Sequence, residues 1–231
     1  MNRQLLVYGS GRHRKPFINH IASMTGKDVP NICFLPTASG DDKDYIISFY
    51  EVCKDLAVRP HVLQVWINSY EQRDTFAEII SKMDAIVVGG GNTLNMLAIW
   101  KAQGIDVLLR GAYDRGCVMA GGSAGSLCWF NGGTTDSRPK ELSIVHGMSF
   151  IDKSHCPHYN SEPSRRPLYH NNILTGKLSS GYACDDLCAI HFVDEEVYNT
   201  LSLDDGNKAY FVEKNGDHII ERPLSVTLLG S

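Results

Sequence analysis

The feature that most constrains the fold is a serine in a glycine-rich turn between an apolar run and a helix-compatible run. Residues 117–120 read as a buried strand. Gly121 and Gly125 stand two residues before and two after Ser123, which completes the pattern G-x-S-x-G. In a nucleophile elbow a serine occupies a strained strand-to-helix turn, and small neighbours are needed because the backbone is crowded. A glycine-rich turn without chemistry is the alternative interpretation.

Short apolar runs alternate with longer amphipathic runs through the first two-thirds of the chain. Strands are expected at residues 5–9, 31–36, 61–66 and 84–88, and helices at 15–24, 41–56, 70–82, 94–101 and 105–115. Near-continuous apolar strands separated by helices predict an α/β fold with a mainly parallel sheet covered by helices on both faces. Ligands bind at the carboxyl ends of the strands in such sheets.

The last third of the chain has a different pattern. Strands are expected at residues 142–148, 181–184 and 188–193, and a helix at 163–174. Two further strands, 208–212 and 218–222, flank the turn Lys214-Asn215-Gly216-Asp217, which is a hairpin signal. The sequence contains no linker, repeat or low-complexity tract, so we expect one catalytic domain over residues 1–231.

Composition narrows the class of protein. At 231 residues and 43% apolar content the chain can build one sizeable core. Its net charge is -4 and no long basic run occurs, so we expect neither a nucleic-acid nor a membrane partner. Seven cysteines without disulfide-framework spacing, and no signal peptide or membrane span, favour the reducing cytoplasm. We expect a monomer or a homodimer.

A serine nucleophile needs a base, which is usually a histidine oriented by a carboxylate. The most informative of the nine histidines lie in residues 154–160, Ser-His-Cys-Pro-His-Tyr-Asn. Pro157 fixes the backbone immediately before His158. His155, Cys156 and His158 also suggest zinc, but no second ligand group has matching spacing.

A second glycine-rich run, Gly-Gly-Gly-Asn-Thr at residues 89–93, follows an expected strand and precedes an expected helix. It lacks the dinucleotide-binding glycine pattern and the lysine of a P-loop. We therefore expect the N–H of Gly91 to form an oxyanion hole with the N–H of Ala124, the residue after the serine.

These three motifs, in this order, resemble peptidase E, the aspartyl dipeptidase family, which is related to cyanophycinase. Its fold is similar to class I glutamine amidotransferase domains. The resemblance spans nearly the whole chain. It implies a cytoplasmic serine peptidase without metal or cofactor, in which Ser123 falls on the nucleophile and His158 on the general base.

The resemblance leaves the acidic member of the triad open. Asp136 matches an acidic residue shortly after the elbow. Asp186, and next to it Asp185, match a carboxylate, commonly glutamate, in a late segment at the end of a strand. A simple turn between two strands is the alternative interpretation of Asp185 and Asp186.

Two residues are candidates for binding the substrate. Arg165 falls on an arginine that resembles a clamp for the aspartyl side chain, and a guanidinium suits this role because it holds a carboxylate in two parallel hydrogen bonds. A solvated arginine at a helix start is the alternative. Asn92, in the second glycine-rich run, is the other candidate.

We therefore expect hydrolysis of a short peptide, a dipeptide with N-terminal aspartate, through an acyl-enzyme on Ser123. One alternative is another amide or isopeptide hydrolase of the same fold. The other is a non-catalytic binding domain with an amidotransferase-like fold.

Overall fold

The structure is a computed structural model that describes residues 2–10, 14–67 and 74–229. The first part of the chain contains β1 (Gln4–Tyr8), α1 (Lys15–Met24), β2 (Asn31–Leu35), α2 (Lys43–Cys53), β3 (Arg59–Val62), α3 (Phe76–Ser81), β4 (Ala85–Val88), α4 (Thr93–Gln103), α5 (Ile105–Asp114), β5 (Val118–Gly122) and α6 (Ala124–Leu127). The second part contains β6 (Phe130–Thr135), β7 (Ser143–Val145), β8 (Ile151–Cys156), α7 (Arg165–Leu174), β9 (Gly181–Cys184), β10 (Cys188–Val193), β11 (Glu196–Ser202), β12 (Ala209–Asn215), β13 (His218–Pro223) and β14 (Val226–Leu228).

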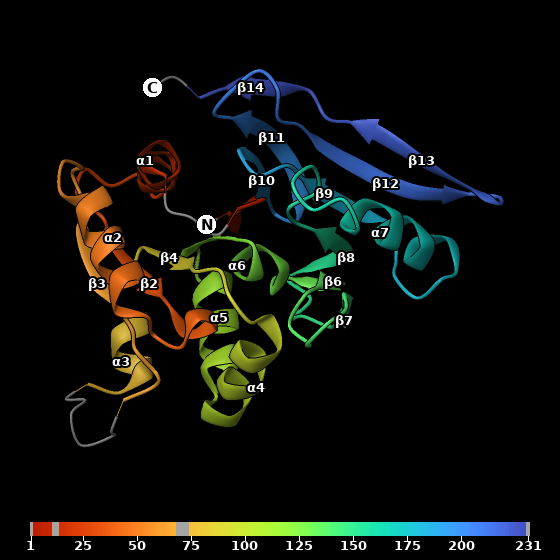
Figure 1. Cartoon of the computed structure of the whole chain (residues 1–231). Helices are drawn as coiled ribbons and strands as arrows, with labels where there is room; N and C mark the ends of the chain where they lie inside the picture. The colour runs from red at the N-terminus through yellow and green to blue at the C-terminus, as the bar shows by residue number, and fades with distance from the viewer. Residues whose placement is uncertain (1, 11–13, 68–73, 230–231) are drawn as a thin grey trace.

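An eight-stranded sheet forms the centre of the fold, in the order β14-β11-β10-β1-β5-β4-β2-β3. The strands β1, β5, β4, β2 and β3 run parallel, while β10 joins β1 antiparallel. Because side chains alternate along a strand, Leu5 and Val7 of β1 pack with the core on the side of α4 and α5, and Leu6 and Tyr8 pack with the core on the side of α1. Helices therefore cover both faces, which confirms the predicted fold class (Figure 1).

A second, six-stranded sheet has the mixed order β13-β12-β9-β8-β6-β7, and α7 packs against it. The two sheets are joined by the turn between β9 and β10, which contains Asp185 and Asp186. The predicted hairpin is confirmed as β12 and β13, where Asn215 pairs with His218 and Gly216 has φ +61°.

Four strands of the structure were not predicted, namely β6, β8, β11 and β14. β8 has the sequence Ile-Asp-Lys-Ser-His-Cys and lacks an apolar run, yet its last three residues are buried. β6 contains two adjacent glycines, and Gly133 is required because a Cβ there would lie 1.9 Å from the carbonyl oxygen of His155. Close strand packing, rather than apolar side chains, thus defines this sheet.

The expected third helix is shorter than predicted. Thr75 and Glu78 form a capping box that begins α3 at Phe76, because each side chain accepts a hydrogen bond from the other residue's backbone N–H. Part of the predicted range 70–82 lies outside the described residues. Within the described part of the chain, no helix combines the length and the apolar character needed to cross a bilayer.

Candidate active site

Ser123 lies on the sharp turn between β5 and α6, with φ +55° and ψ -119°. This backbone conformation is strained for a residue with a side chain. The flanking glycines are sterically required: a Cβ on Gly121 would lie 2.3 Å from the carbonyl oxygen of Gly125, and one on Gly125 would lie 2.1 Å from that of Val88. The glycines at positions 121 and 125 thus permit the close packing that places Ser123 at the end of β5.

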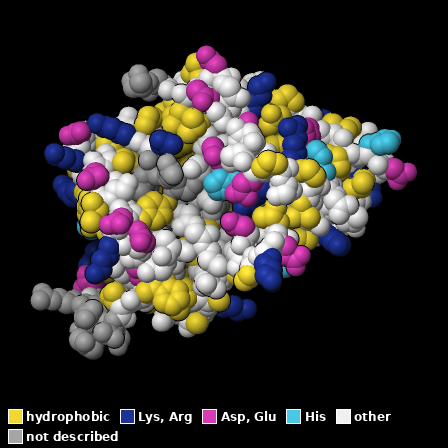
Figure 2. Space-filling model, in the orientation of Figure 1, with side chains coloured by type: hydrophobic (Ala, Val, Ile, Leu, Met, Phe, Trp, Pro, Cys, Tyr) yellow, Lys and Arg dark blue, Asp and Glu magenta, His cyan; other side chains and the backbone are white. Residues whose placement is uncertain are grey.

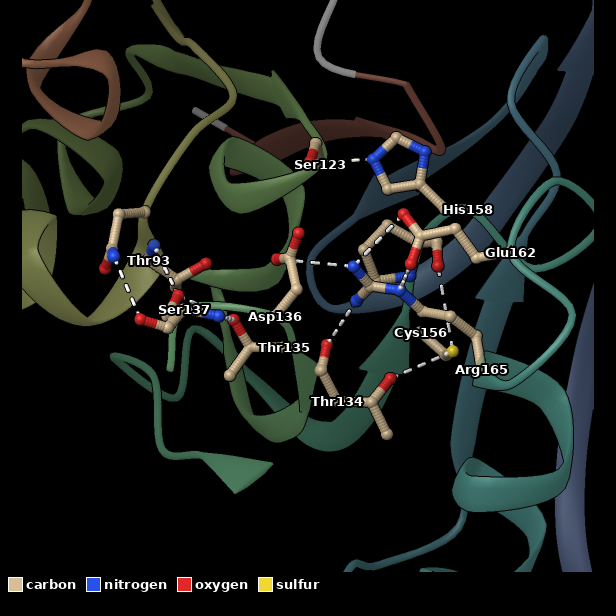
Figure 3. Close-up of polar contacts among 12 residues, drawn as sticks. Thr93, Ser123, Thr134, Thr135, Asp136, Ser137, Cys156, His158, Glu162 and Arg165 are labelled. Carbon is tan, nitrogen blue, oxygen red and sulfur yellow. Dashed lines mark hydrogen bonds and ion pairs between the residues drawn. The ribbon is translucent and has the colours of Figure 1, made fainter. Parts of the chain in front are cut away.

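Ser123, His158 and Asp186 form a continuous hydrogen-bonded chain. The hydroxyl oxygen of Ser123 lies 2.8 Å from Nε2 of His158. Nδ1 of the same ring lies 2.7 Å from Oδ1 of Asp186. Figure 3 shows the Ser123 hydroxyl and the His158 ring facing one another from different elements. The expected contact between serine and histidine is therefore present at ordinary hydrogen-bond length.

The loop after β8 holds the histidine in place. His158 itself has φ +55°, in the left-handed region. The backbone N–H of Tyr159 donates to the carbonyl oxygen of Cys184 at 3.1 Å, and the backbone N–H of Asp186 donates to Oδ1 of Asn160 at 3.2 Å. The loop is thus attached on both sides of the turn that contains Asp186.

The other two candidate acids have different partners. Oδ1 of Asp136 lies 3.4 Å from Nη2 of Arg165, and the Asp136 side chain is 67% exposed. Asp185 is buried, and its Oδ2 accepts the backbone N–H of Lys208 at 2.8 Å. Burial raises the pKa of the Asp185 carboxyl. Of the three carboxylates considered, the structure places Asp186 against the histidine.

The second glycine-rich run lies between β4 and α4. Gly91 has φ +136°, and a Cβ there would lie 2.2 Å from the carbonyl oxygen of Ala38. The side chain of Asn92 is used by the fold: its oxygen accepts the N–H of Asn95 at 2.9 Å, and its nitrogen donates to the carbonyl oxygen of Ser137 at 3.0 Å. Asn92 is thus the N-cap of α4, and its expected contact with the substrate stays a prediction.

Arg165 is almost fully buried, with 3% of its side chain exposed. Its Nε donates to Glu162 at 2.6 Å and its Nη1 donates to the carbonyl oxygen of Thr134 at 2.8 Å. Figure 3 shows the guanidinium enclosed by Glu162, Asp136 and Thr134, on the same side of the fold as His158. The alternative of a solvated arginine at a helix start is therefore wrong, because the guanidinium is held in a network of oxygen acceptors.

His155, Cys156 and His158 do not converge on a common point. Nδ1 of His155 lies 3.2 Å from the carbonyl oxygen of Tyr182, and its Nε2 lies 3.0 Å from the Ser126 hydroxyl. The sulfur of Cys156 lies 3.1 Å from the Thr134 hydroxyl. In the described residues, no group of three or more histidine, cysteine or acidic side chains is arranged to hold a metal ion.

Sequence reasoning missed the role of His155 and Ser126. Burial lowers the pKa of His155 to about 3, so its ring is neutral. The ring stacks on Phe130 at 4.4 Å between centroids. The Ser126 hydroxyl lies between this ring and the carbonyl oxygen of Ser123, at 2.8 Å from the latter. His155 and Ser126 therefore form a hydrogen-bonded pair that supports the backbone of the elbow at Ser123. Their only signal in the sequence was that Ser126 is next to the elbow motif and His155 lies in the histidine motif at residues 154–160.

The surface around the site is acidic. On the face shown in Figure 2, acidic side chains and a histidine gather near the centre. Glu162 and Asp136 retain exposed fractions of 36% and 67% beside the buried Arg165.

Comparisons with known proteins agree with the fold. Residues 5–200 match the family described as peptidase family S51. The chain is 43% identical over 211 residues to the uncharacterized peptidase YgaJ of Bacillus subtilis (strain 168), covering 91% of this chain and 90% of that protein. It is 26% identical over 216 residues to peptidase E of Pasteurella multocida (strain Pm70), covering 85% and 88%. The solved structure of a peptidase from an acI-B1 Actinobacterium superposes with a TM-score of 0.75 at 16% identity, covering 98% of this chain and 95% of that one.

The fold and these matches define a serine-type peptidase, a hydrolase of the α/β class. The chain belongs to peptidase family S51.

Proposed function

We propose that the protein hydrolyses short peptides that begin with aspartate, through an acyl-enzyme on Ser123. The observation that carries this proposal is the unbroken chain from the Ser123 hydroxyl through the His158 ring to Asp186. Asp186 accepts the Nδ1–H of His158, which leaves Nε2 as the acceptor for the serine proton. The tautomer needed for general-base catalysis is thus the one that the neighbours select.

The reaction proceeds in two halves. As the Ser123 oxygen attacks the peptide carbonyl, Nε2 of His158 takes the hydroxyl proton and Asp186 stabilises the imidazolium. His158 then gives this proton to the leaving amine, so the C–N bond breaks and the ester on Ser123 remains. A water molecule repeats the sequence and releases the acid. The backbone N–H groups of Gly91 and Ala124 hold the oxyanion in both halves.

Arg165 supplies the preference for aspartate. The Nε of Arg165 donates to Glu162 at 2.6 Å and its Nη1 to the carbonyl oxygen of Thr134 at 2.8 Å. Its Nη2 donates to Oε1 of Glu162 at 3.3 Å and also lies 3.4 Å from Asp136. Asp136 is the most exposed of these partners. A substrate carboxylate can therefore take its place against Nη2 while the contacts with Glu162 and Thr134 remain. The substrate's free amino group would lie near the acidic side chain of Glu162.

Kinetics on matched dipeptides test this proposal. We would measure kcat/KM for Asp-Leu and Ala-Leu in the wild type and in Arg165→Gln. The variant should lose Asp-Leu cleavage by about 100-fold or more, because the substrate carboxylate would lose its charged partner, and Ala-Leu cleavage far less. Arg138→Gln, which removes the same charge from an exposed site on the nearby loop, is the control.

Asp136→Ala tests directly whether the substrate carboxylate replaces that of Asp136 at Nη2 of Arg165. Its side chain is exposed, so the fold should tolerate the change. Removing the competitor should lower KM for Asp-Leu and leave KM for Ala-Leu unchanged. Equal effects on both dipeptides would remove Arg165 from the specificity role. A wild type that prefers Ala-Leu would remove the aspartate assignment and leave a serine peptidase.

The two alternatives make different predictions. An amide or isopeptide hydrolase of this fold would react with a fluorophosphonate at Ser123 but would cleave neither dipeptide. A non-catalytic binding domain would not react at Ser123 at all. The hydrogen-bonded chain to His158 and Asp186 favours reaction, because it makes the hydroxyl a nucleophile.

A further inference from the structure

Outside the chain of Ser123, His158 and Asp186, the carboxylate of Glu221 joins three elements close to the active site. Glu221 lies on β13 of the C-terminal hairpin. Nε of Arg166 donates to its Oε1 at 2.8 Å, and Nε2 of His170 lies 2.7 Å from the same oxygen. The hydroxyl of Tyr159 also donates to Oε1, and Nη2 of Arg166 donates to Oε2. The hairpin, α7 and the loop after β8 therefore meet at this carboxylate.

Glu221 is partly buried and ionised. Its side chain is 17% exposed. Burial alone would raise the pKa of Glu221, but the hydrogen bonds from Arg166, Tyr159 and His170 outweigh burial, so its pKa lies below the ordinary value. A carboxylate with donors from three side chains fixes their positions strongly, because charge-assisted hydrogen bonds are stronger than neutral ones.

Tyr159 connects this carboxylate to the catalytic histidine. It follows His158 in the chain, and it is only 3% exposed. Its ring lies 5.4 Å from that of Tyr210, and the guanidinium of Arg166 lies 5.0 Å above it. Its backbone N–H is bound to Cys184, and its hydroxyl is bound to Glu221 and lies 2.8 Å from Nε2 of His170. Tyr159 is thus attached at both ends, directly beside His158.

The backbone of His158 needs such attachment. Its φ of +55° is an uncommon conformation for a residue other than glycine. Such conformations persist only when the surrounding structure over-determines them. On one side Pro157 restricts the backbone, and on the other side Tyr159 is the next fixed residue.

We propose that Glu221 is a positioning residue, which holds the His158 ring between Ser123 and Asp186 by anchoring the hydroxyl of Tyr159. The inference rests on the proposed role of His158 as the general base. It makes the C-terminal hairpin a part of the catalytic apparatus although its carboxylate touches no reacting atom. A misplacement of the base by about 1 Å would cost on the order of 100-fold in rate.

Two substitutions test the anchor at its two ends. Glu221→Gln keeps the size of the side chain and removes its charge, and Tyr159→Phe removes the hydroxyl and leaves the ring in place. Each should lower kcat for the preferred dipeptide about 10- to 100-fold and change KM by less than about twofold. The double variant should cost little more than either single one, because both weaken the same contact.

The hairpin provides a matched control. Glu213 lies on β12 and pairs with Arg222, which is 64% exposed. Glu213→Gln makes the same chemical change in the same hairpin, away from Tyr159. It should leave kcat unchanged. Thermal unfolding of all variants separates a loss of fold from a loss of position.

A spectroscopic signal distinguishes positioning from general stability. The Nδ1–H of His158, bound to Asp186, should give a downfield proton resonance in the wild type, and Glu221→Gln and Tyr159→Phe should shift or broaden it. If Glu221→Gln lowers only the unfolding temperature, with kcat, fluorophosphonate labelling of Ser123 and this resonance unchanged, the positioning role is overturned. Failure of the wild type to label at Ser123 would instead overturn the proposed function.

Discussion

The backbone N–H of Asp186 donates to the side-chain oxygen of Asn160, two residues beyond His158, at 3.2 Å. The side-chain nitrogen of Asn160 in turn donates to Asn207 at 2.8 Å, and Asn207 is bound to Asp204. One short motif therefore contains the histidine and also holds the backbone of the carboxylate that contacts it. The relative position of these two residues is fixed by the motif itself.

Loss of the Asn160 side chain should leave the position of Asp186 less well fixed. We expect Asn160→Ala to lower kcat about tenfold, because Asp186 would keep its carboxylate but lose the hydrogen bond that fixes its backbone. Steady-state kinetics on the preferred dipeptide measure this effect. Asn131→Ala, which removes an exposed amide bound to Asp152 and Ser179, is the control and should leave kcat unchanged.

Replacing the acid by its amide should be far more damaging. Asp186→Asn keeps the shape of the side chain but introduces an amide N–H that can donate to Nδ1 of His158 and so favours the wrong tautomer, and we expect kcat to fall by about 10⁴-fold. Asp136→Asn should change kcat on Ala-Leu by less than about threefold. The reverse ranking of these two variants would assign the orienting role to Asp136.

The nucleophile and the base should act as a unit. Ser123→Ala and His158→Ala should each remove nearly all activity, on the order of 10⁴- to 10⁶-fold, and the double variant should lose little more. Active-site titration and turnover of the purified variants provide the measurement. Full retention of peptide cleavage by Ser123→Ala would contradict an acyl-enzyme on this residue.

Gly91→Ala should destabilise the fold as well as the site. The new Cβ would meet the carbonyl of Ala38 at 2.2 Å, in a backbone conformation with φ +136°. We expect an unfolding free energy lower by about 2–4 kcal/mol. Gly26→Ala also has a positive φ, +66°, but has no neighbouring atom within 4 Å, so it measures the cost of an ordinary left-handed backbone without a steric clash. An equal effect of both substitutions would show that Ala38 yields to the methyl group.

Stability should fall as the pH is lowered below about 6.5. Burial, and then the nearby His20, lower the pKa of His191 to about 4. Between these pH values the unfolded chain binds a proton that the folded chain does not, so stability is lost as the pH falls, by at most about 1.4 kcal/mol per pH unit for this group. Urea unfolding at pH 7, 6 and 5 should show a shallower dependence in His191→Gln. An unchanged slope would contradict the lowered pKa.

Sequence patterns predicted the elements that depend on the residues of one short segment. The strands β1, β2, β4 and β5 of the parallel sheet are largely apolar runs, and close packing at the elbow requires the glycines at 121 and 125. The strand expected at 61–66 is found instead at Arg59–Val62, because β3 lies at the edge of the sheet and carries no buried apolar run. β8 and β6 were missed because they pair through glycines and polar residues in a mixed sheet. The sequence could not choose among the three acids, because that choice depends on which strand ends meet.

The contacts of Arg165 also depended on tertiary structure. Its charge predicted a partner, but only the fold shows that Glu162 and Thr134 already occupy Nε and Nη1. Glu221 gave no signal at all in the sequence, since it lies 63 residues beyond His158, in a hairpin without a catalytic motif. Its partners are set by the packing of α7 against β12 and β13.

The turn that contains Asp186 joins a strand of one sheet to a strand of the other. Ser123 precedes His158 in the chain, and Asp186 takes its place only after β9 and β10 have joined their two different sheets. During synthesis, the growing chain therefore carries Ser123 for some time before His158 and Asp186 are in position. An unfinished polypeptide of this kind has no assembled triad, so hydrolytic activity becomes a property of the nearly completed fold.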